Sequence, residues 1–211
     1  ARILFGLEPF ERGQVLINGT PRVRVSPQDS IGRGLAFVTE NRREEGLLME
    51  ATIVENVGLV ALPAFAARFP RILRHRRLRA AVLRVAQSLQ IKSGPIRRTP
   101  AKNLSGGNQQ KVVIGKWLMT RPSVFLMDEP TRGIDVGAKY EVYSIINDLA
   151  AQGAGILLIS SELEELMGMC DRIVVMSKGE IQGSFERGQF AQEPILHAAF
   201  KGHQVHHRES E

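Results

Sequence analysis

The sequence predicts an α/β fold, a mostly parallel sheet with crossover helices and an inserted block of helices. Three short apolar runs support the sheet, because such runs are typical of strands buried on both faces: Leu35–Val38, Val124–Met127 and Ile156–Ser160. Helical patterns separate these runs, as connections between parallel strands require. The longest helical stretch, residues 52–119, lies between the first two runs, so we expect it to form its own subdomain.

The first fifty residues are expected to hold the beginning of the sheet core. A short β run at residues 15–18 has Val23–Val25 as its expected partner. A helix is expected to begin after Ser26, because serine is a favoured N-cap, Pro27 suits the first turn, and Asp29 lies near the positive end of the helix dipole.

The inserted block follows. Residues 52–92 are expected to form helical pieces cut by Pro63 and Pro70, because proline cannot continue a helix. A loop is expected over residues 91–102, and the next helix over residues 105–119. The predicted parts of the chain are residues 1–51, 52–119, 120–190 and a polar tail, 191–211.

The last part of the chain returns to the sheet. A helix is predicted over residues 137–152, since its apolar side chains keep a helical stripe: Val142, Ile145, Ile146 and Leu149. A helix around residues 162–168 leads to a predicted hairpin of Arg172–Met176 and Ile181–Phe185. Three histidines are expected to belong to a frayed polar terminus rather than a metal site: His203, His206 and His207.

Charge and composition limit the classes of partner. The formal charge is +6, and arginines concentrate between residues 68 and 84. We interpret this run as the solvated face of a helix, with apolar residues on its buried side: Ile72, Leu73, Leu78, Val82, Leu83 and Val85. Nucleic-acid binding is not expected, because no Phe, Trp or Tyr between Pro70 and Lys116 could stack on bases. The single cysteine, Cys170, excludes an internal disulfide and is expected to be a small buried residue.

The stretch NLSGGNQQK, residues 103–111, has the chemistry of an anion site. Ser105, Gly106 and Gly107 open a predicted helix, where free backbone N–H groups and the helix dipole favour a phosphate. Glycine permits close backbone approach, and Asn108, Gln109 and Gln110 are expected to keep the start of the helix polar. A plain N-cap role for Ser105 stays open. No G-x-x-x-x-G-K-S/T loop occurs in the sequence.

A second motif, VFLMDEPTRGID, places two carboxylates after a buried strand. Asp128 and Glu129 follow this strand at its carboxyl end, where open α/β sheets bind ligands. An aspartate there can hold Mg²⁺ beside nucleotide phosphates. The adjacent glutamate can act as a general base toward water. Alone, the two acids could equally cap a strand end.

Together, LSGGNQQK, MDEPTRGID and LLISSEL resemble the nucleotide-binding domain of ATP-binding-cassette (ABC) transporters, over essentially the whole chain. The spellings TENRREEGL and CDRIVVMSKGEI resemble the second of two ATPase domains in bacterial carbohydrate-import ATPases of the ribose, galactose and xylose type. The resemblance implies a P-loop-NTPase-like core with an inserted helical signature subdomain. It also implies ATP and Mg²⁺ as cofactors and a peripheral position on the cytoplasmic face of the inner membrane.

The resemblance also implies partners and roles. The partners are another nucleotide-binding domain on the same polypeptide, transmembrane permease subunits facing residues 40–51 and the helical block, and indirectly a periplasmic sugar-binding protein. Ser105, Gly106, Gly107 and Asn108 would contact an ATP held by the partner domain. In the chain's own site Asp128 matches the Mg²⁺-associated aspartate, Glu129 the catalytic glutamate and Asp135 the aspartate that couples the two sites across the interface.

Three departures from the family pattern set further expectations. Glu40 stands where most relatives have a glutamine; its carboxylate can reach Mg²⁺ and nucleotide, but it lacks the amide donor. Ser161 stands at the position of the switch histidine, so slow or regulatory turnover is expected in the chain's own site. The chain is expected to begin after the P-loop, so the isolated chain should bind ATP poorly and be inactive.

Two alternatives to the transporter ATPase stay open. One is a non-catalytic regulatory ABC module, which Ser161 and the missing P-loop favour. The other is a soluble ABC protein acting on ribosomes or nucleic acid, suggested by the arginine run.

Overall fold

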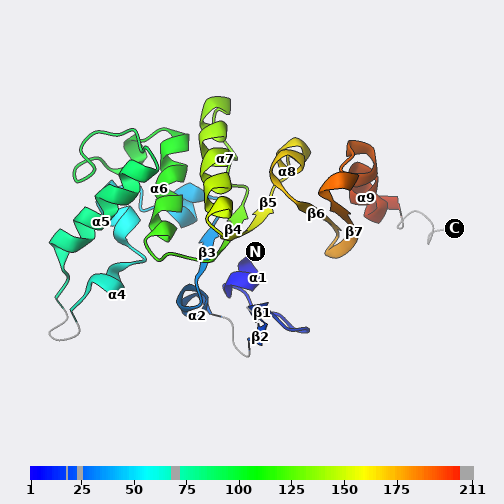
Figure 1. The fold of residues 1–211 in the computed structure, drawn as a ribbon, viewed down its shortest axis with the longest axis horizontal. Helices are drawn as coiled ribbons and strands as arrows, with labels where there is room; N and C mark the ends of the chain where they lie inside the picture. The colour runs from blue at the N-terminus through cyan, green and yellow to red at the C-terminus, as the bar shows by residue number, and fades with distance from the viewer. Residues whose placement is uncertain (18, 23–25, 68–71, 205–211) are drawn as a thin grey trace. The chain divides into compact units, whose positions relative to one another are not determined.

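The computed structural model describes residues 1–17, 19–22, 26–67 and 72–204 (Figure 1). The chain divides into two compact units, residues 1–159 and 160–211. The boundaries expected after residues 51 and 119 therefore lie inside the first unit.

A three-stranded parallel sheet forms the centre of the first unit. Its strands are β3 (Leu35–Val38), β4 (Val124–Asp128) and β5 (Gly155–Ile159), in the order β3-β4-β5. All of β3 is buried, as expected. The expectation of full burial is wrong for β5, where Gly155 and Leu157 are exposed, because the described sheet ends at this strand.

Helices cover both faces of this sheet (Figure 1). On one side lie α6 (Gly106–Leu118) and α7 (Val136–Ala151), and on the other α1 (Arg2–Phe5) and α2 (Pro27–Gly32). Aromatic contacts join the layers, since the ring of Phe5 lies 5.4 Å from that of Phe37 and 5.5 Å from that of Trp117. The core of the first unit is therefore continuous from α1 through β3 to α6.

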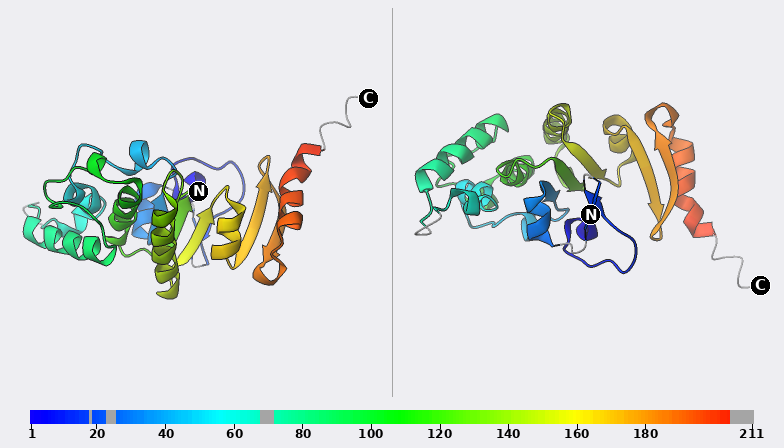
Figure 2. Two further views of the ribbon diagram at one scale, coloured as in Figure 1. Left: turned by 90° about the horizontal axis from the view of Figure 1, so that it is seen from above. Right: turned by 60° about the horizontal axis from the view of Figure 1, so that its bottom comes forward.

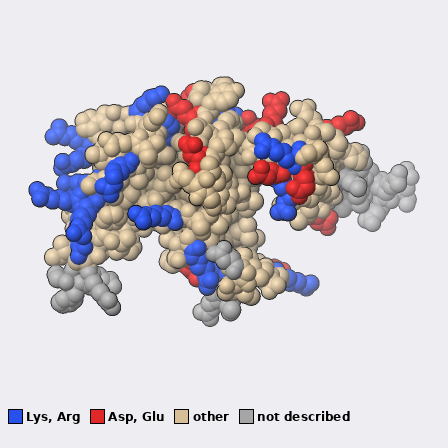
Figure 3. All heavy atoms as spheres, viewed as in Figure 1, with Lys and Arg blue, Asp and Glu red and all other residues tan. Residues whose placement is uncertain are grey.

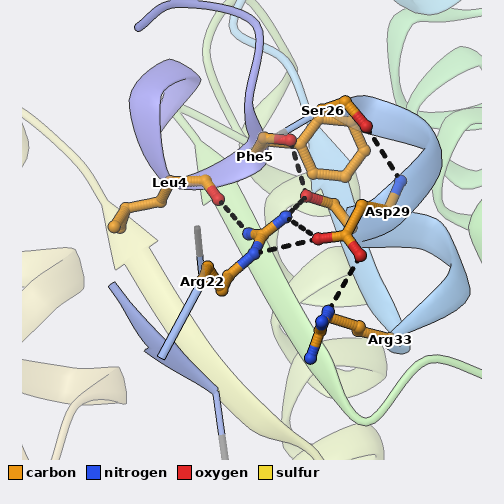
Figure 4. Close-up of polar contacts among 7 residues, drawn as sticks. Leu4, Phe5, Arg22, Ser26, Asp29 and Arg33 are labelled. Atoms are coloured by element: carbon orange, nitrogen blue, oxygen red, sulfur yellow. Dashed lines mark hydrogen bonds and ion pairs between the residues drawn. The ribbon is translucent and has the colours of Figure 1, made fainter. Parts of the chain in front are cut away.

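A buried arginine holds the first thirty residues together (Figure 4). The Arg22 side chain is 0% exposed and binds Asp29 Oδ2 at 2.7 Å. It also donates to Ser30 Oγ at 2.9 Å and to the Leu4 carbonyl at 3.1 Å. The Ser30 hydroxyl in turn donates to the Phe5 carbonyl at 2.6 Å. The guanidinium thereby links the end of α1 to α2.

The flanking elements agree in part with expectation. The Ser26 hydroxyl caps α2 by accepting from the Asp29 amide at 3.2 Å, as predicted. The strand β1 (Leu16–Ile17) pairs with β2 (Thr20–Pro21). The expected partner, Val23–Val25, lies outside the described residues.

The inserted block contains short helices. They are α3 (Ile53–Gly58), α4 (Leu62–Phe65), α5 (His75–Ser88) and the 3₁₀ turn η2 (Ala101–Asn103), and η1 (Arg42–Gly46, a π-helix) precedes the block. Pro63 lies in the first turn of α4, so it begins a helix; Pro70 lies outside the described residues. Arginines of α5 are exposed while Leu78 and Val82 are buried, which confirms a solvated basic face. The expected burial of Ile72 and Leu83 is wrong, since they are 63% and 45% exposed.

An ion-pair cluster joins α7 to the inserted block. Lys111 Nζ lies 2.8 Å from Glu141 Oε2, and Lys92 Nζ lies 2.9 Å from Glu141 Oε1. The Lys111 side chain is only 3% exposed. Hydrogen bonds from Lys111 and then Lys92 lower the pKa of Glu141 to about 2.

Glu141→Gln is expected to lower the free energy of unfolding at pH 7 by about 1–3 kcal/mol, because the buried Lys111 ammonium loses its charged partner. The lower half of this range is expected, since Glu141 is 41% exposed and solvent screens it. A lowered folded-state pKa stabilises the fold above the ordinary value of about 4.3, and this contribution is lost as pH falls toward 2. Urea unfolding at pH 7 and pH 3 should therefore show the difference from wild type shrinking. A difference that does not change with pH, or an equal loss in the exposed-site control Asp148→Asn, would contradict this.

The second unit is a hairpin packed against helices. It contains α8 (Leu163–Met169), β6 (Arg172–Ser177), β7 (Glu180–Glu186), the turn η3 (Arg187–Gln189) and α9 (Gln192–Gln204). The hairpin confirms the prediction. The polar tail is wrong over residues 192–204, because α9 lies along the hairpin (Figure 2) and buries Ile195 and Ala198 against Ile173 and Val175. His206 and His207 lie outside the described residues, and α9 includes His203.

Candidate functional site

The start of α6 presents an exposed serine at a helix N-terminus. The Ser105 hydroxyl accepts from the Asn108 amide at 3.4 Å and from Asn108 Nδ2 at 2.9 Å, so Ser105 is an N-cap in this structure. Asn108 Oδ1 accepts from the Lys92 amide at 2.8 Å, which fixes the asparagine. Ser105 is exposed, and the N-terminus of a thirteen-residue helix lies directly behind it.

The glycines of this turn face the chain's own atoms. A Cβ at Gly107 would lie 2.5 Å from Ala138 Cβ on α7, and a Cβ at Gly106 would lie 3.3 Å from the Gly133 carbonyl oxygen. From the sequence, these glycines were expected to let the backbone approach a phosphate closely. In this structure they let α6 lie close to the segment that begins α7. The two motifs, far apart in sequence, lie against each other.

The two glutamines after this turn are not a polar surface. Gln109 and Gln110 are 1% and 2% exposed. Gln109 Nε2 donates to the Leu104 carbonyl at 3.2 Å and to the Ala101 carbonyl at 3.3 Å. The expectation that they keep the start of the helix polar is wrong, because the α6 face that carries them packs into the inserted block.

The carboxylates of the second motif lie at the carboxyl end of β4. Asp128 is the last residue of this strand, and Glu129 follows it with a φ of 46°. The Glu129 amide donates to the Ile159 carbonyl at 2.9 Å, which fixes the turn to the end of β5. A left-handed conformation is uncommon for glutamate, and such residues cluster at functional sites. Both side chains are half-buried at the sheet edge where ligands bind in this fold class.

The loop after these acids leads to Asp135. The Asp135 side chain accepts from the Ala138 amide at 3.0 Å and caps α7. Asp135 is exposed, whereas Thr131 within the loop is 1% exposed. The structure thus brings Ser105–Asn108 and the loop ending at Asp135 to one surface.

Glu40 lies at the same sheet edge as Asp128, since it is two residues beyond β3 and Val38 pairs with Met127. Its carboxylate forms an ion pair with Arg132, a partner that the sequence did not indicate. Both side chains are about half exposed or more, at 48% and 66%, so the pair can exchange with other ligands at little cost.

A bound Mg²⁺ usually uses one or two carboxylates together with substrate phosphates and water. Asp128 fits that requirement, because its half-buried carboxylate stands at the strand end with solvent on one side. Within the described ranges, no group of three or more His, Cys, Asp or Glu side chains is arranged to hold a metal.

Ser161 belongs to the second unit, so it is described apart from the acids of the first. It is exposed and lies in the segment between β5 and α8. Next to it, the Glu162 amide donates to Ser160 Oγ at 3.0 Å.

Arg42 was not predicted from sequence, although it contacts both halves of the site. Its guanidinium donates to the carbonyls of Arg132 and Gly133 and to the side chain of Gln109. In the sequence, only its position two residues after Glu40 indicated that it could lie near the site. In the structure this position begins η1.

An apolar pocket of about 520 Å³ opens beside α3 to α5. Five leucines line it together with Arg79 and Arg97: Leu48, Leu59, Leu62, Leu73 and Leu78. A second hollow of about 530 Å³ shares both arginines. Lysine and arginine side chains gather over the part of the molecule that carries α5 (Figure 3). In the described part of the chain, no helix has the length and apolar character of a membrane-crossing segment.

Comparison with known proteins finds relatives that are import ATP-binding proteins. The ribose import ATP-binding protein RbsA of Geobacillus kaustophilus is 46% identical over 201 residues, which cover 94% of this chain and 40% of that protein. The xylose import ATP-binding protein XylG of the same organism is 45% identical, with 91% of this chain and 38% of that protein covered. A putative ribose/galactose/methyl galactoside import ATP-binding protein of Rhizobium etli is 43% identical, covering 96% and 38%. The chain thus spans about two fifths of the length of these relatives.

Solved structures agree on the fold. A nucleotide-free ATP-binding cassette from an ABC transporter matches with a TM-score of 0.77 at 19% identity, covering 93% of this chain and 80% of that one. A dimeric cassette bound to ADP and Pi in a post-hydrolysis state matches with a TM-score of 0.72 at 20% identity, covering 90% and 79%. The model of the family described as ABC transporter matches residues 1–132, which is more than half of this sequence. On the strength of this match and of the identity to the import ATP-binding proteins, the chain belongs to the ABC transporter family.

Proposed function

We propose that this chain is the second ATPase domain of a bacterial carbohydrate-import ATPase that acts with membrane permeases at the cytoplasmic face of the inner membrane. The observation that carries the proposal is the surface shared by the exposed Ser105 turn and the loop from Glu129 to Asp135. The names of relatives, which are ribose and xylose import ATP-binding proteins, support the carbohydrate class.

The Ser105 turn is proposed to complete the ATP site of a partner domain. Its hydroxyl is exposed at the N-terminus of α6, so it can receive a γ-phosphate presented from outside the chain. Donors fixed in advance toward developing negative charge lower the barrier to phosphoryl transfer. Asp135, exposed at the N-cap of α7, is proposed to cross to the same partner.

In the chain's own site, Glu129 is proposed to accept a proton from the attacking water. Its left-handed turn is fixed by the bond from its amide to the Ile159 carbonyl, and Asp128 directly precedes it at the end of β4. Mg²⁺, held through Asp128 with Glu40 as the second candidate ligand, would neutralise phosphate charge when bound. With Ser161 in place of histidine, hydrolysis here is proposed to be slow.

The apolar pocket lined by Leu48 and Leu62 is proposed to receive a cytoplasmic segment of the permease. Apolar grooves rimmed by charge suit an amphipathic helix, which inserts its apolar side chains and leaves its polar face outside. Arg79 and Arg97 on the rim favour acidic residues in that segment.

The experiment is Glu129→Gln in the complete ATPase assembled with its permease, in a background where the partner domain is catalytically inactive. Residual ATP hydrolysis should fall by about 10²–10⁴-fold, the usual contribution of a general base. Phosphate release in single-turnover assays measures it. Asp148→Asn, an exposed carboxylate near the far end of α7, is the control and should retain wild-type activity.

A regulatory module is the second candidate, because the exposed Ser161 cannot supply the charge of a switch histidine. If Glu129→Gln leaves residual hydrolysis unchanged while the permease-bound complex still depends on Ser105, the chain regulates and does not catalyse.

A further inference from the structure

We propose that Arg42 is a positioning residue that holds the Ser105 turn against the Arg132–Gly133 segment and so sets the shape of the phosphate-binding surface. The inference rests on the proposed function, since this surface is taken to contact a partner's nucleotide. Arg42 itself contacts neither substrate nor reacting atoms in this assignment.

The guanidinium of Arg42 joins two segments that are distant in sequence. Its Nη1 donates to the Arg132 carbonyl at 2.8 Å and its Nη2 to the Gly133 carbonyl at 3.1 Å. Its Nε donates to Gln109 Oε1 at 3.4 Å, and Gln109 in turn donates to the carbonyl of Leu104, the residue before the turn. One side chain therefore holds both the helix that carries Ser105 and the loop after Glu129.

The arginine also lies directly beneath the turn. Its Nη2 lies 2.9 Å from the position that a Cβ on Gly106 would take. Glycine at this position thus makes room for the guanidinium, which places a permanent positive charge behind the anion-binding amides. A lysine could supply the charge, but its single ammonium cannot reach two carbonyls and an amide in this planar arrangement.

The segment that carries Arg42 is itself anchored to α6. The other end of η1 is held by Lys116, whose Nζ donates to the Gly46 carbonyl at 2.7 Å. A Cβ on Gly46 would lie 3.2 Å from Val113 Cγ2, so η1 lies close along α6. Single π-helical turns are rare in proteins, and those that do occur are often found at functional sites. Because η1 is fixed to α6 in this way, the guanidinium of Arg42 has a defined position.

The consequence for catalysis follows from where ATP is held. Because the partner domain supplies most of the nucleotide's binding contacts, a displaced turn should leave the KM for ATP nearly unchanged. Transition-state contacts depend on position far more steeply, so kcat should fall. A merely structural role of Arg42 would lower the fraction of folded protein and would not produce this split.

The test compares Arg42→Gln and Arg42→Lys with Arg172→Gln, an exposed arginine on β6 in the second unit. In the complete ATPase assembled with its permease, both Arg42 variants should lower kcat about tenfold with KM for ATP within twofold, and Arg172→Gln should leave both unchanged. Hydrogen exchange of the 211-residue chain should show faster exchange, about fivefold or more, in residues 106–109 and 132–138 of the Arg42 variants and unchanged exchange in α5.

Each outcome decides a separate point. Full activity of Arg42→Lys would show that charge suffices and would overturn the positioning role. Unchanged exchange in residues 106–109 and 132–138 would overturn it independently of any activity. If the wild-type complex and Arg172→Gln both lack ATP hydrolysis, the proposed function fails, and the exchange experiment still decides whether Arg42 positions the turn.

Discussion

In the complete ATPase, Ser105→Asp is expected to reduce ATP hydrolysis by about 10²–10³-fold, the usual cost of losing one preorganised donor to developing negative charge. Aspartate is as good an N-cap as serine, so α6 should keep its start and the free energy of unfolding should change by less than about 0.5 kcal/mol. A carboxylate, however, cannot donate to a γ-phosphate and repels it. Steady-state ATPase assays and urea unfolding measure the two effects.

The same substitution at a second N-cap is the matched control. Ser26 caps α2 by accepting from the Asp29 amide at 3.2 Å, so Ser26→Asp tests the cap chemistry away from the proposed surface. It should leave ATP hydrolysis at the wild-type rate. A wild-type rate for Ser105→Asp as well would mean that Ser105 serves only as a cap, and the phosphate role would be wrong.

Arg22→Ala is expected to lower the free energy of unfolding of this chain by about 1–3 kcal/mol, the usual cost of leaving a buried hydrogen-bonding group unsatisfied. The Arg22 side chain is 0% exposed, and its loss leaves the Ser30 hydroxyl and the Leu4 carbonyl without this donor. Urea unfolding followed by circular dichroism measures the change.

Arg33→Ala is the control for this prediction, because Arg33 binds the other oxygen of the same Asp29 carboxylate at 2.9 Å but is 39% exposed. An exposed ion pair is worth at most about 1 kcal/mol, so the loss should be much smaller. Equal losses in the two variants would show that burial of Arg22 does not determine its contribution.

Local sequence rules predicted the elements well. The Ser26 cap, the apolar strands β3 and β4 and the β6–β7 hairpin each follow from patterns within a few residues. The helix α9 was missed although its signal was present: Ile195 and Ala198 are three residues apart on one face, and Pro194 suits a first turn.

Contacts between distant segments could not be predicted in the same way. Arg42 meets carbonyls 90 and 91 residues away, and no local pattern indicates this. Gln109 and Gln110 are polar in sequence and buried in the fold. For Gln109, backbone carbonyls of the inserted block and the Arg42 side chain supply partners. The site was therefore predicted as a set of motifs, whereas the tertiary contacts that hold it appeared only in the structure.

The contact between Gly107 and Ala138 makes the substitutions tolerated at one position depend on the residue at the other. Because a Cβ at 107 would lie 2.5 Å from Ala138 Cβ, there is room for one methyl group at this crossing of α6 and α7. The order of mutations then matters: Ala138→Gly first costs about 1 kcal/mol of helix stability and makes room for Gly107→Ala, whereas the reverse order passes through a clashing intermediate. Positions 107 and 138 should accordingly covary among homologous sequences, as a case of sign epistasis set by a single steric contact.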